Sequence, residues 1–143
     1  MTTGQFVKEL SWTEDMNNVP FDKYDFIWKT YSQHGYITLY SEDAPGINIF
    51  DYLKAGFSKF LADYFNRLFS CAAEDISDLW NSGHQCIHAQ QEADIMLDYL
   101  KQFLYKFKSL PYFAFSFLTR LIHEYLAAIR KADAIYNFFF RGY

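Results

Sequence analysis

The sequence predicts an α/β fold in which helices pack on a small, mostly parallel sheet. Twice in the chain an amphipathic helical pattern runs into a short apolar stretch, first from residues 22–35 into 36–40 and again from 92–108 into 112–118. Helices that alternate with strands are typical of parallel sheets. Ionisable residues follow both apolar stretches, and open α/β sheets bind ligands beyond the carboxyl ends of their strands. We therefore expect a ligand-binding edge at these strand ends.

The first predicted helix–strand unit follows an irregular start. Glycine, paired asparagines and proline interrupt any period in residues 1–21. Asp22 is a suitable N-cap for the helix at 22–35, and Gly35 can take the left-handed conformation that ends it. Residues 36–40 are mainly β-branched or aromatic, which favours a buried strand.

The middle of the chain predicts a second helix between two loops. Residues 47–57 and 75–89 lack a clear period and indicate loops. Ser58 is a suitable N-cap for the helix between them. Apolar residues recur at helical spacing after Ser58, namely Leu61, Tyr64, Phe65, Leu68, Phe69 and Ala72.

The second predicted unit is the clearest one. An apolar stripe and C-terminal lysines indicate a helix at 92–108, which Pro111 stops. Residues 112–118 are apolar without alternation, which predicts a strand buried on both faces. A last helical pattern covers residues 131–140. Two clear strands are fewer than the roughly five or six of a mean sheet, so we expect the sheet to be incomplete.

Composition excludes several classes of protein. The 143 residues favour one domain, and a hydrophobic fraction of 51% with 21% charged residues argues against disorder. The net charge is -4 and there is no dense basic run, so no nucleic-acid partner is predicted. No apolar run reaches the roughly 18–20 residues of a membrane span. The N-terminus lacks a signal-peptide pattern, so the sequence itself indicates no compartment.

Aromatic residues are unusually frequent. They make up 22% of the chain, with Phe 16 and Tyr 12, which is more than a small solitary domain needs. Either the core is rich in aromatic rings, or the chain presents aromatic side chains to a partner. We favour the second interpretation because several aromatic residues lie in stretches predicted to be irregular, namely Phe6, Trp12, Phe50, Tyr52, Phe57 and Trp80.

Five stretches carry a resemblance to a known family through their order and spacing. They lie at residues 26–29, 35–45, 63–69, 96–99, and 111–113 together with 123–125. Together they resemble the metazoan, nematode-rich family of uncharacterised sulfatase-like proteins in the alkaline-phosphatase superfamily. Two positions depart from that family, since Leu68 stands where the family commonly has proline and His88 where it usually has glycine. The match covers most of residues 20–140.

The resemblance implies a partial alkaline-phosphatase or sulfatase-like fold and a hydrolase of sulfate or phosphate esters. Such enzymes use a hydroxyl nucleophile bound to a divalent metal. The family places the nucleophile upstream of the part seen here and a metal-binding Asp-His pair downstream. The chain has no Asp-Gly-Val-Ser-like or Ser-Asp-His-Gly-like segment. We therefore expect residues 1–143 to be a single incomplete segment: an internal fragment, a truncated gene product or a degenerate paralogue.

That expectation extends to cofactors, partners and location. The segment is expected to be inactive alone and to hold no cofactor, although an intact parent would hold a divalent metal. Its partner would be the missing remainder of the fold or another protein. The family's usual setting is secretory or membrane-associated.

Three residues are candidates for substrate binding, and none is predicted to be catalytic or to bind metal. The resemblance places His123 after the second strand, where it would contact the substrate anion. Glu42 and Asp43 follow the first strand. Two acids cannot hold an oxyanion without a metal, so they would accept hydrogen bonds from a sugar or another polar substrate. The alternative for Glu42 and Asp43 is a solvated turn, and for His123 a surface position.

A weaker candidate is a zinc site. His84, Cys86 and His88 alternate, so a strand would place all three on one face. A fourth ligand is absent nearby in the sequence, and the stretch does not have the composition of a strand. We favour the hydrolase-family interpretation, and the alternative is a non-catalytic interaction or ligand-binding protein that uses exposed aromatic residues.

Overall fold

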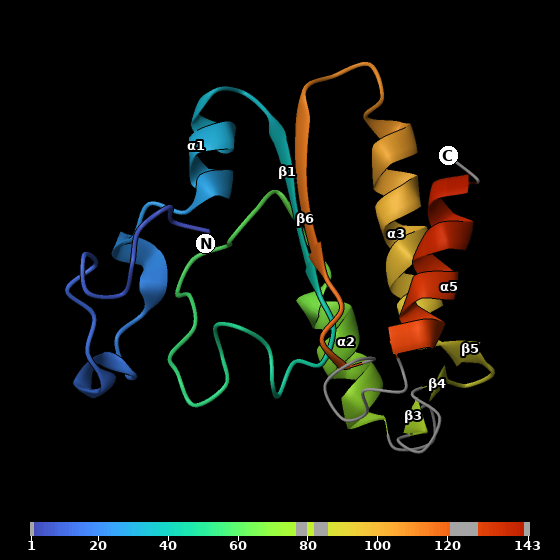
Figure 1. Ribbon diagram of the computed structural model, residues 1–143, viewed down its shortest axis with the longest axis horizontal. Helices are drawn as coiled ribbons and strands as arrows, with labels where there is room; N and C mark the ends of the chain where they lie inside the picture. Colours follow the sequence, from blue (N-terminus) through green and yellow to red (C-terminus); the bar gives the residue numbers. More distant parts are fainter. Residues whose placement is uncertain (1, 77–79, 82–85, 121–128, 142–143) are drawn as a thin grey trace.

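A computed structural model describes residues 2–76, 80–81, 86–120 and 129–141. Its centre is a three-stranded parallel sheet in the order β2-β1-β6, formed by Tyr64–Phe65, Ile37–Glu42 and Tyr112–Phe117. Helix α1 lies on one face of the sheet, and α3 and α5 lie on the other (Figure 1). The predicted α/β class with a small parallel sheet is confirmed.

The register brings the carboxyl ends of the two long strands together. Ile37 lies opposite Tyr112, and Glu42 at the end of β1 lies opposite Phe117 at the end of β6. The short strand β2 pairs with the middle of β1, with Leu39 opposite Tyr64. Glu42 and Asp43 at the end of β1 and Arg120 after β6 therefore lie at one edge of the sheet, as predicted.

Three predicted helices are present with adjusted bounds: α1 covers Ile27–Gln33, α3 covers Glu92–Lys106 and α5 covers Ile129–Arg141. Gly35 has φ +77 and follows α1 as predicted. The prediction that Asp22 caps this helix is wrong. Asp22 lies in a short 3-10 turn, Phe21–Lys23, and its carboxylate accepts hydrogen bonds from the Ser58 and Lys59 N–H groups at 2.8 and 3.0 Å.

The prediction that the next helix starts at Ser58 is also wrong. Helix α2 covers Arg67–Asp75, and Tyr64–Phe65 before it is strand β2. Tyr64 packs on Phe103 of α3, whereas Phe65 packs on Tyr40 of β1, with ring centroids 5.5 and 5.8 Å apart. Pairing with β1 and packing on two opposite layers override the local helical spacing.

The stretch predicted as the loop 75–89 contains parts of a second sheet. Trp80–Asn81, Cys86–Ile87 and Gln90–Gln91 form the short antiparallel strands β3, β4 and β5. The prediction that residues 112–118 are buried on both faces is wrong in degree. Residues 112–116 are half-buried and Phe117 is 40% exposed, since β6 is the last strand on its side of the sheet.

Two cores cover the two faces of the main sheet. The α1 side is mainly aromatic, and its buried residues are Phe21, Tyr24, Phe26, Trp28, Tyr40, Phe50 and Leu61. The α3 side is mainly aliphatic, and its buried residues are Ala93, Met96, Leu97, Leu118 and Phe139. The interpretation as an aromatic-rich core, which was not favoured, therefore describes the α1 side.

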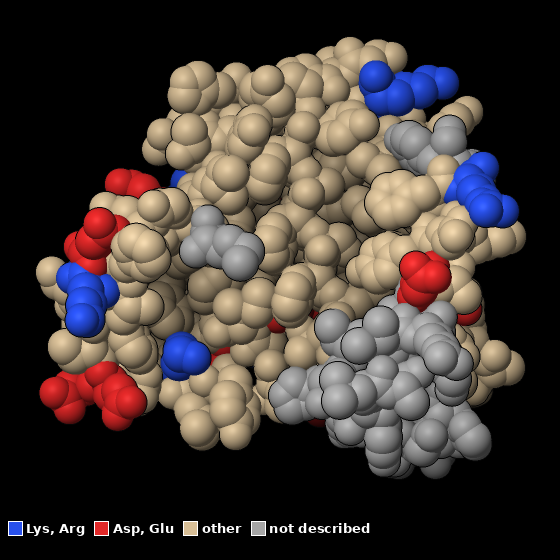
Figure 2. All heavy atoms as spheres, viewed as in Figure 1, with Lys and Arg blue, Asp and Glu red and all other residues tan. Residues whose placement is uncertain are grey.

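The favoured interpretation, a missing partner surface, stays a prediction, and the aromatic residues that motivated it differ in exposure. Phe50 is buried and Phe57 packs against the aromatic core, whereas Phe6 and Tyr52 are 80% and 52% exposed. Figure 2 shows one face of the molecule, on which Lys, Arg, Asp and Glu lie mainly toward the sides and other residue types cover the middle.

Candidate functional site

Two adjacent acids at the end of β1 point into different surroundings. Glu42 and Asp43 are only 4% and 2% exposed, so neither belongs to a solvated turn. Successive side chains of a strand leave on opposite faces of the sheet. Glu42 accordingly joins Tyr40 on the α1 side, whereas Asp43 contacts the residues that follow β6. The sequence placed both acids in one site, but the structure separates them.

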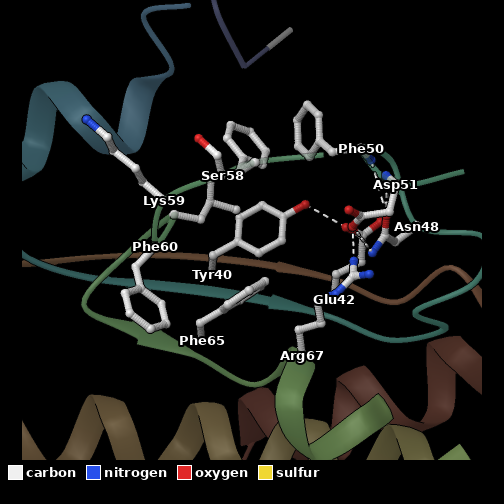
Figure 3. Close-up of a pocket in the computed structure, with 12 residues that line it drawn as sticks. Tyr40, Glu42, Asn48, Phe50, Asp51, Ser58, Lys59, Phe60, Phe65 and Arg67 are labelled. Carbon is white, nitrogen blue, oxygen red and sulfur yellow. Dashed lines mark hydrogen bonds and ion pairs between the residues drawn. The ribbon is translucent and has the colours of Figure 1, made fainter. Parts of the chain in front are cut away.

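Glu42 is held by one side chain and one backbone group. Its Oε2 accepts a hydrogen bond from the Tyr40 hydroxyl at 2.5 Å (Figure 3). Its Oε1 accepts one from the Ile49 N–H at 2.7 Å. Burial raises the pKa of Glu42, and these two hydrogen bonds oppose that effect. Burial beside Glu42 also raises the pKa of Tyr40, so its hydroxyl stays protonated and donates to the carboxylate.

A cavity of about 350 Å³ lies beside Glu42 on this side of the sheet. Asn48, Asp51 and Arg67 form its polar end together with Glu42 (Figure 3). Arg67 pairs with the Asp51 carboxylate, and the Asn48 side-chain amide donates to the same carboxylate at 2.6 Å. Most of the remaining lining is aromatic or apolar, and Ser58 and Lys59 complete it. The aromatic and apolar residues are Tyr40, Phe50, Phe57, Phe60, Leu61 and Phe65.

Asp43 joins the ends of the two long strands. Its Oδ1 accepts a hydrogen bond from the Thr119 N–H at 2.7 Å, and its Oδ2 accepts one from the Arg120 N–H at 3.0 Å. Burial raises the pKa of Asp43, and both backbone hydrogen bonds oppose that rise. Each carboxylate oxygen is thus committed to the backbone, and Asp43 is not among the residues that line the cavity.

Arg120 connects this side of the edge to two helices. Its guanidinium pairs with Glu74 of α2, and its Nε lies 3.1 Å from Oε2 of Glu92 at the start of α3. Glu92 is only 3% exposed. Burial, opposed by Arg120, raises the pKa of Glu92 to about 7. Glu92 is therefore a buried acid that changes charge near neutral pH.

His123 lies outside the described residues, so its surroundings are not described. Asp43 holds the backbone of Thr119 and Arg120, which are the last described residues before the gap at 121–128. His84 of the weaker zinc candidate also lies outside the described residues. Cys86 is in strand β4, whereas His88 follows it in a turn with φ 55, so the three residues do not form one strand.

Sequence reasoning missed most of the cavity's polar end and the partners of Arg120. Asn48 accepts hydrogen bonds from the Phe50 and Asp51 N–H groups, so the Asn-x-x-Asp spacing was an available local signal for this turn. The ion pairs of Arg67 and Arg120 had no such signal, because their partners lie far away in the sequence.

In the described part of the chain, no group of three or more His, Cys, Asp or Glu side chains is arranged to hold a metal ion. Among the helices that the structure describes, none combines the length and the apolar character that a membrane crossing needs.

Comparison with protein families identifies one match. The model of a family described as "Protein of unknown function (DUF229)" matches residues 2–143, so the chain belongs to this family. Searches of curated proteins and of solved structures each found no match. The family description assigns no activity, and the sulfatase-like activity therefore stays a prediction.

Proposed function

We propose that this family member is a sulfatase-like hydrolase of sulfate or phosphate esters in the alkaline-phosphatase superfamily. In this proposal the present 143 residues supply a substrate-facing edge of the sheet. The position of Glu42 carries the proposal, because it is a buried acid at the carboxyl end of a parallel strand and lines a cavity of about 350 Å³. Strand ends of this kind bind ligands in open α/β sheets. The stretch at 35–45 that contains Glu42 also carries the sequence resemblance.

The three candidate residues take different roles in the proposal. An acid repels an oxyanion, so Glu42 contacts the alcohol part of the ester. Asp43 is a positioning residue, since it holds the backbone that leads from β6 toward residue 123. His123 contacts the sulfate or phosphate group, and only the sequence supports that assignment.

Binding without turnover is the expected behaviour of the 143-residue chain. Its sequence contains neither the nucleophile segment nor the metal-binding Asp-His segment of the family that it resembles. When bound in such an enzyme, a divalent metal would activate the attacking hydroxyl and neutralise developing charge. The residues described in this chain do not hold one, so no step of hydrolysis is assigned to them.

The test is to incubate the pure chain with 4-nitrophenyl sulfate and 4-nitrophenyl phosphate in the presence of calcium, zinc or manganese. We expect no release of nitrophenol, but binding of the intact esters by calorimetry that His123→Ala weakens. Phe6→Ala is the matched control because Phe6 is 80% exposed and does not line the cavity. Turnover that His123→Ala abolishes would contradict the proposed lack of catalysis, and absence of ester binding would contradict the proposed substrate-facing edge.

A second candidate is a non-catalytic interaction protein, which the exposed aromatic side chains favour. Phe60 and Phe138 are 87% and 82% exposed, so both rings are available for contact with a partner. Strong binding of an apolar dye with a poorly cooperative melt would indicate an uncovered interface. A sharp melt without dye binding would instead favour an autonomous domain.

A further inference from the structure

The cavity beside Glu42 has balanced charges. Four charged residues line it: Glu42 and Asp51 are acids, and Lys59 and Arg67 are bases. Arg67 and Asp51 also pair with each other. The two acids would repel a strongly anionic ligand, and the two bases would repel an organic cation. The lining therefore favours a ligand without net charge.

The lining of the cavity combines hydrogen-bond donors with acceptors. Arg67 and Lys59 can only donate, and the two carboxylates accept. Ser58 also lines the cavity, where its hydroxyl donates to Asp22 at 2.9 Å and keeps lone pairs that can accept. Hydroxyl groups on a ligand both donate and accept, so a polyhydroxylated ligand matches this mixture better than a group with only one of the two capacities.

Aromatic rings form the other end of the cavity. Phe60 lines the cavity although it is 87% exposed, so it lies at the rim, and the half-buried Phe65 lies beside it on the side toward Arg67 (Figure 3). The Phe60 ring therefore offers an open apolar face next to the polar groups of the cavity. The C–H groups on one face of a pyranose ring pack on an aromatic ring, whereas its hydroxyl groups project from the edges.

We propose that this cavity binds a neutral sugar ring, with its C–H face against Phe60 and its hydroxyl groups toward Glu42, Asp51 and Arg67. The inference rests on the proposed function and deepens it, because it names a sugar as the alcohol part of the ester. A plain aromatic ring would fill the aromatic end but leave the polar end unmatched. The positive charges of Lys59 and Arg67 would repel a quaternary ammonium group.

The test is to titrate the full chain with the methyl glycosides of glucose, galactose and N-acetylglucosamine. Calorimetry and saturation-transfer NMR measure the binding. We expect at least one glycoside to bind, and Phe60→Ala to weaken that binding at least tenfold. The matched control is again Phe6→Ala, which removes an equally exposed ring outside the cavity and should leave binding unchanged. Lys59→Gln should change the affinity less than threefold because the ligand carries no charge.

Inorganic sulfate, choline and 4-nitrophenol serve as competitors for the three rival ligand classes. The sugar assignment is overturned if no glycoside binds, if Phe60→Ala binds as well as the unmodified chain, or if one of these competitors binds in the cavity more tightly than every glycoside. If the nitrophenyl esters bind but no glycoside does, the sugar inference alone is contradicted. Binding of the sugar without binding of the esters would support it and sink the ester hydrolase proposal.

Discussion

The two sides of the carboxyl end of β1 differ in how they use a buried acid. Glu42 accepts one hydrogen bond from a hydroxyl and one from a loop N–H, and it faces a cavity. Asp43 accepts two hydrogen bonds from the backbone after β6, next to an arginine that pairs with two helices. One side of this edge opens on a cavity, whereas the other fastens the elements together. Burial alone therefore does not distinguish an acid that lines a cavity from an acid that only holds the backbone.

The hydrophobic cores on these two sides of the sheet also differ. On the α1 side, Trp28 is 1% exposed and stacks on Phe26 with ring centroids 4.7 Å apart. On the α3 side, Met96 is equally buried but contacts polar groups, including the Ser41 hydroxyl at 3.9 Å. The side with the cavity thus has the more aromatic packing.

The largest expected effect is on the aromatic core. Trp28→Ala should lower the free energy of unfolding by about 3–5 kcal/mol, because it removes the ring that packs on Phe26 and Tyr40. Met96→Ala should cost less, about 2–3 kcal/mol, since a flexible thioether leaves neighbours that relax more easily. Urea denaturation measures both values. A larger loss for Met96→Ala would contradict the view that the aromatic side dominates stability.

The next effect separates the two acids. Asp43→Asn should lower the free energy of unfolding by about 2 kcal/mol, because the amide NH₂ group then faces a backbone N–H and cannot accept. Glu42→Gln should cost less than about 1 kcal/mol. The Tyr40 hydroxyl can reverse and accept from the new amide, while the Ile49 N–H keeps an acceptor. Equal losses in denaturant melts would show that the two carboxylates are held alike.

A further effect concerns pH on the α3 side. The folded state raises the pKa of Glu92 from 4.5 to about 7, so the fold binds this proton more tightly than the unfolded chain does. The resulting stabilisation is full below about pH 4.5 and is lost as pH rises through about 7. Glu92→Gln should flatten this part of the pH dependence of unfolding. Asp94→Asn, an exposed acid on the same helix, is the control and should leave the slope unchanged.

The smallest effect is expected at the rim of the cavity. Phe60→Ala should change the free energy of unfolding by less than about 0.5 kcal/mol, because the ring is already exposed to solvent. Phe6→Ala should behave alike in the same denaturant melts, which makes the two variants comparable in binding experiments. A loss of unfolding free energy of about 2 kcal/mol or more for Phe60→Ala alone is typical of a buried side chain. Such a loss would assign Phe60 to the core and remove the argument for a ligand.

The sequence by itself determined the α/β class, and it predicted a helix at 92–108, strands at 36–40 and 112–118, and the glycine turn at Gly35, all of which the structure contains with adjusted bounds. These features depend on apolar periodicity and backbone conformation within a short window. Both strand ends could also be predicted to meet, because parallel strands align their carboxyl ends.

Only the tertiary structure decided that Tyr64–Phe65 is a strand, that Glu42 and Asp43 serve opposite sides of the sheet, and which acids Arg120 contacts. The physical reason is separation along the chain. Asp43 and Thr119 are 76 residues apart, and Arg120 and Glu74 are 46 residues apart. Such pairs depend on how the layers pack, and no local pattern in the sequence encodes that packing.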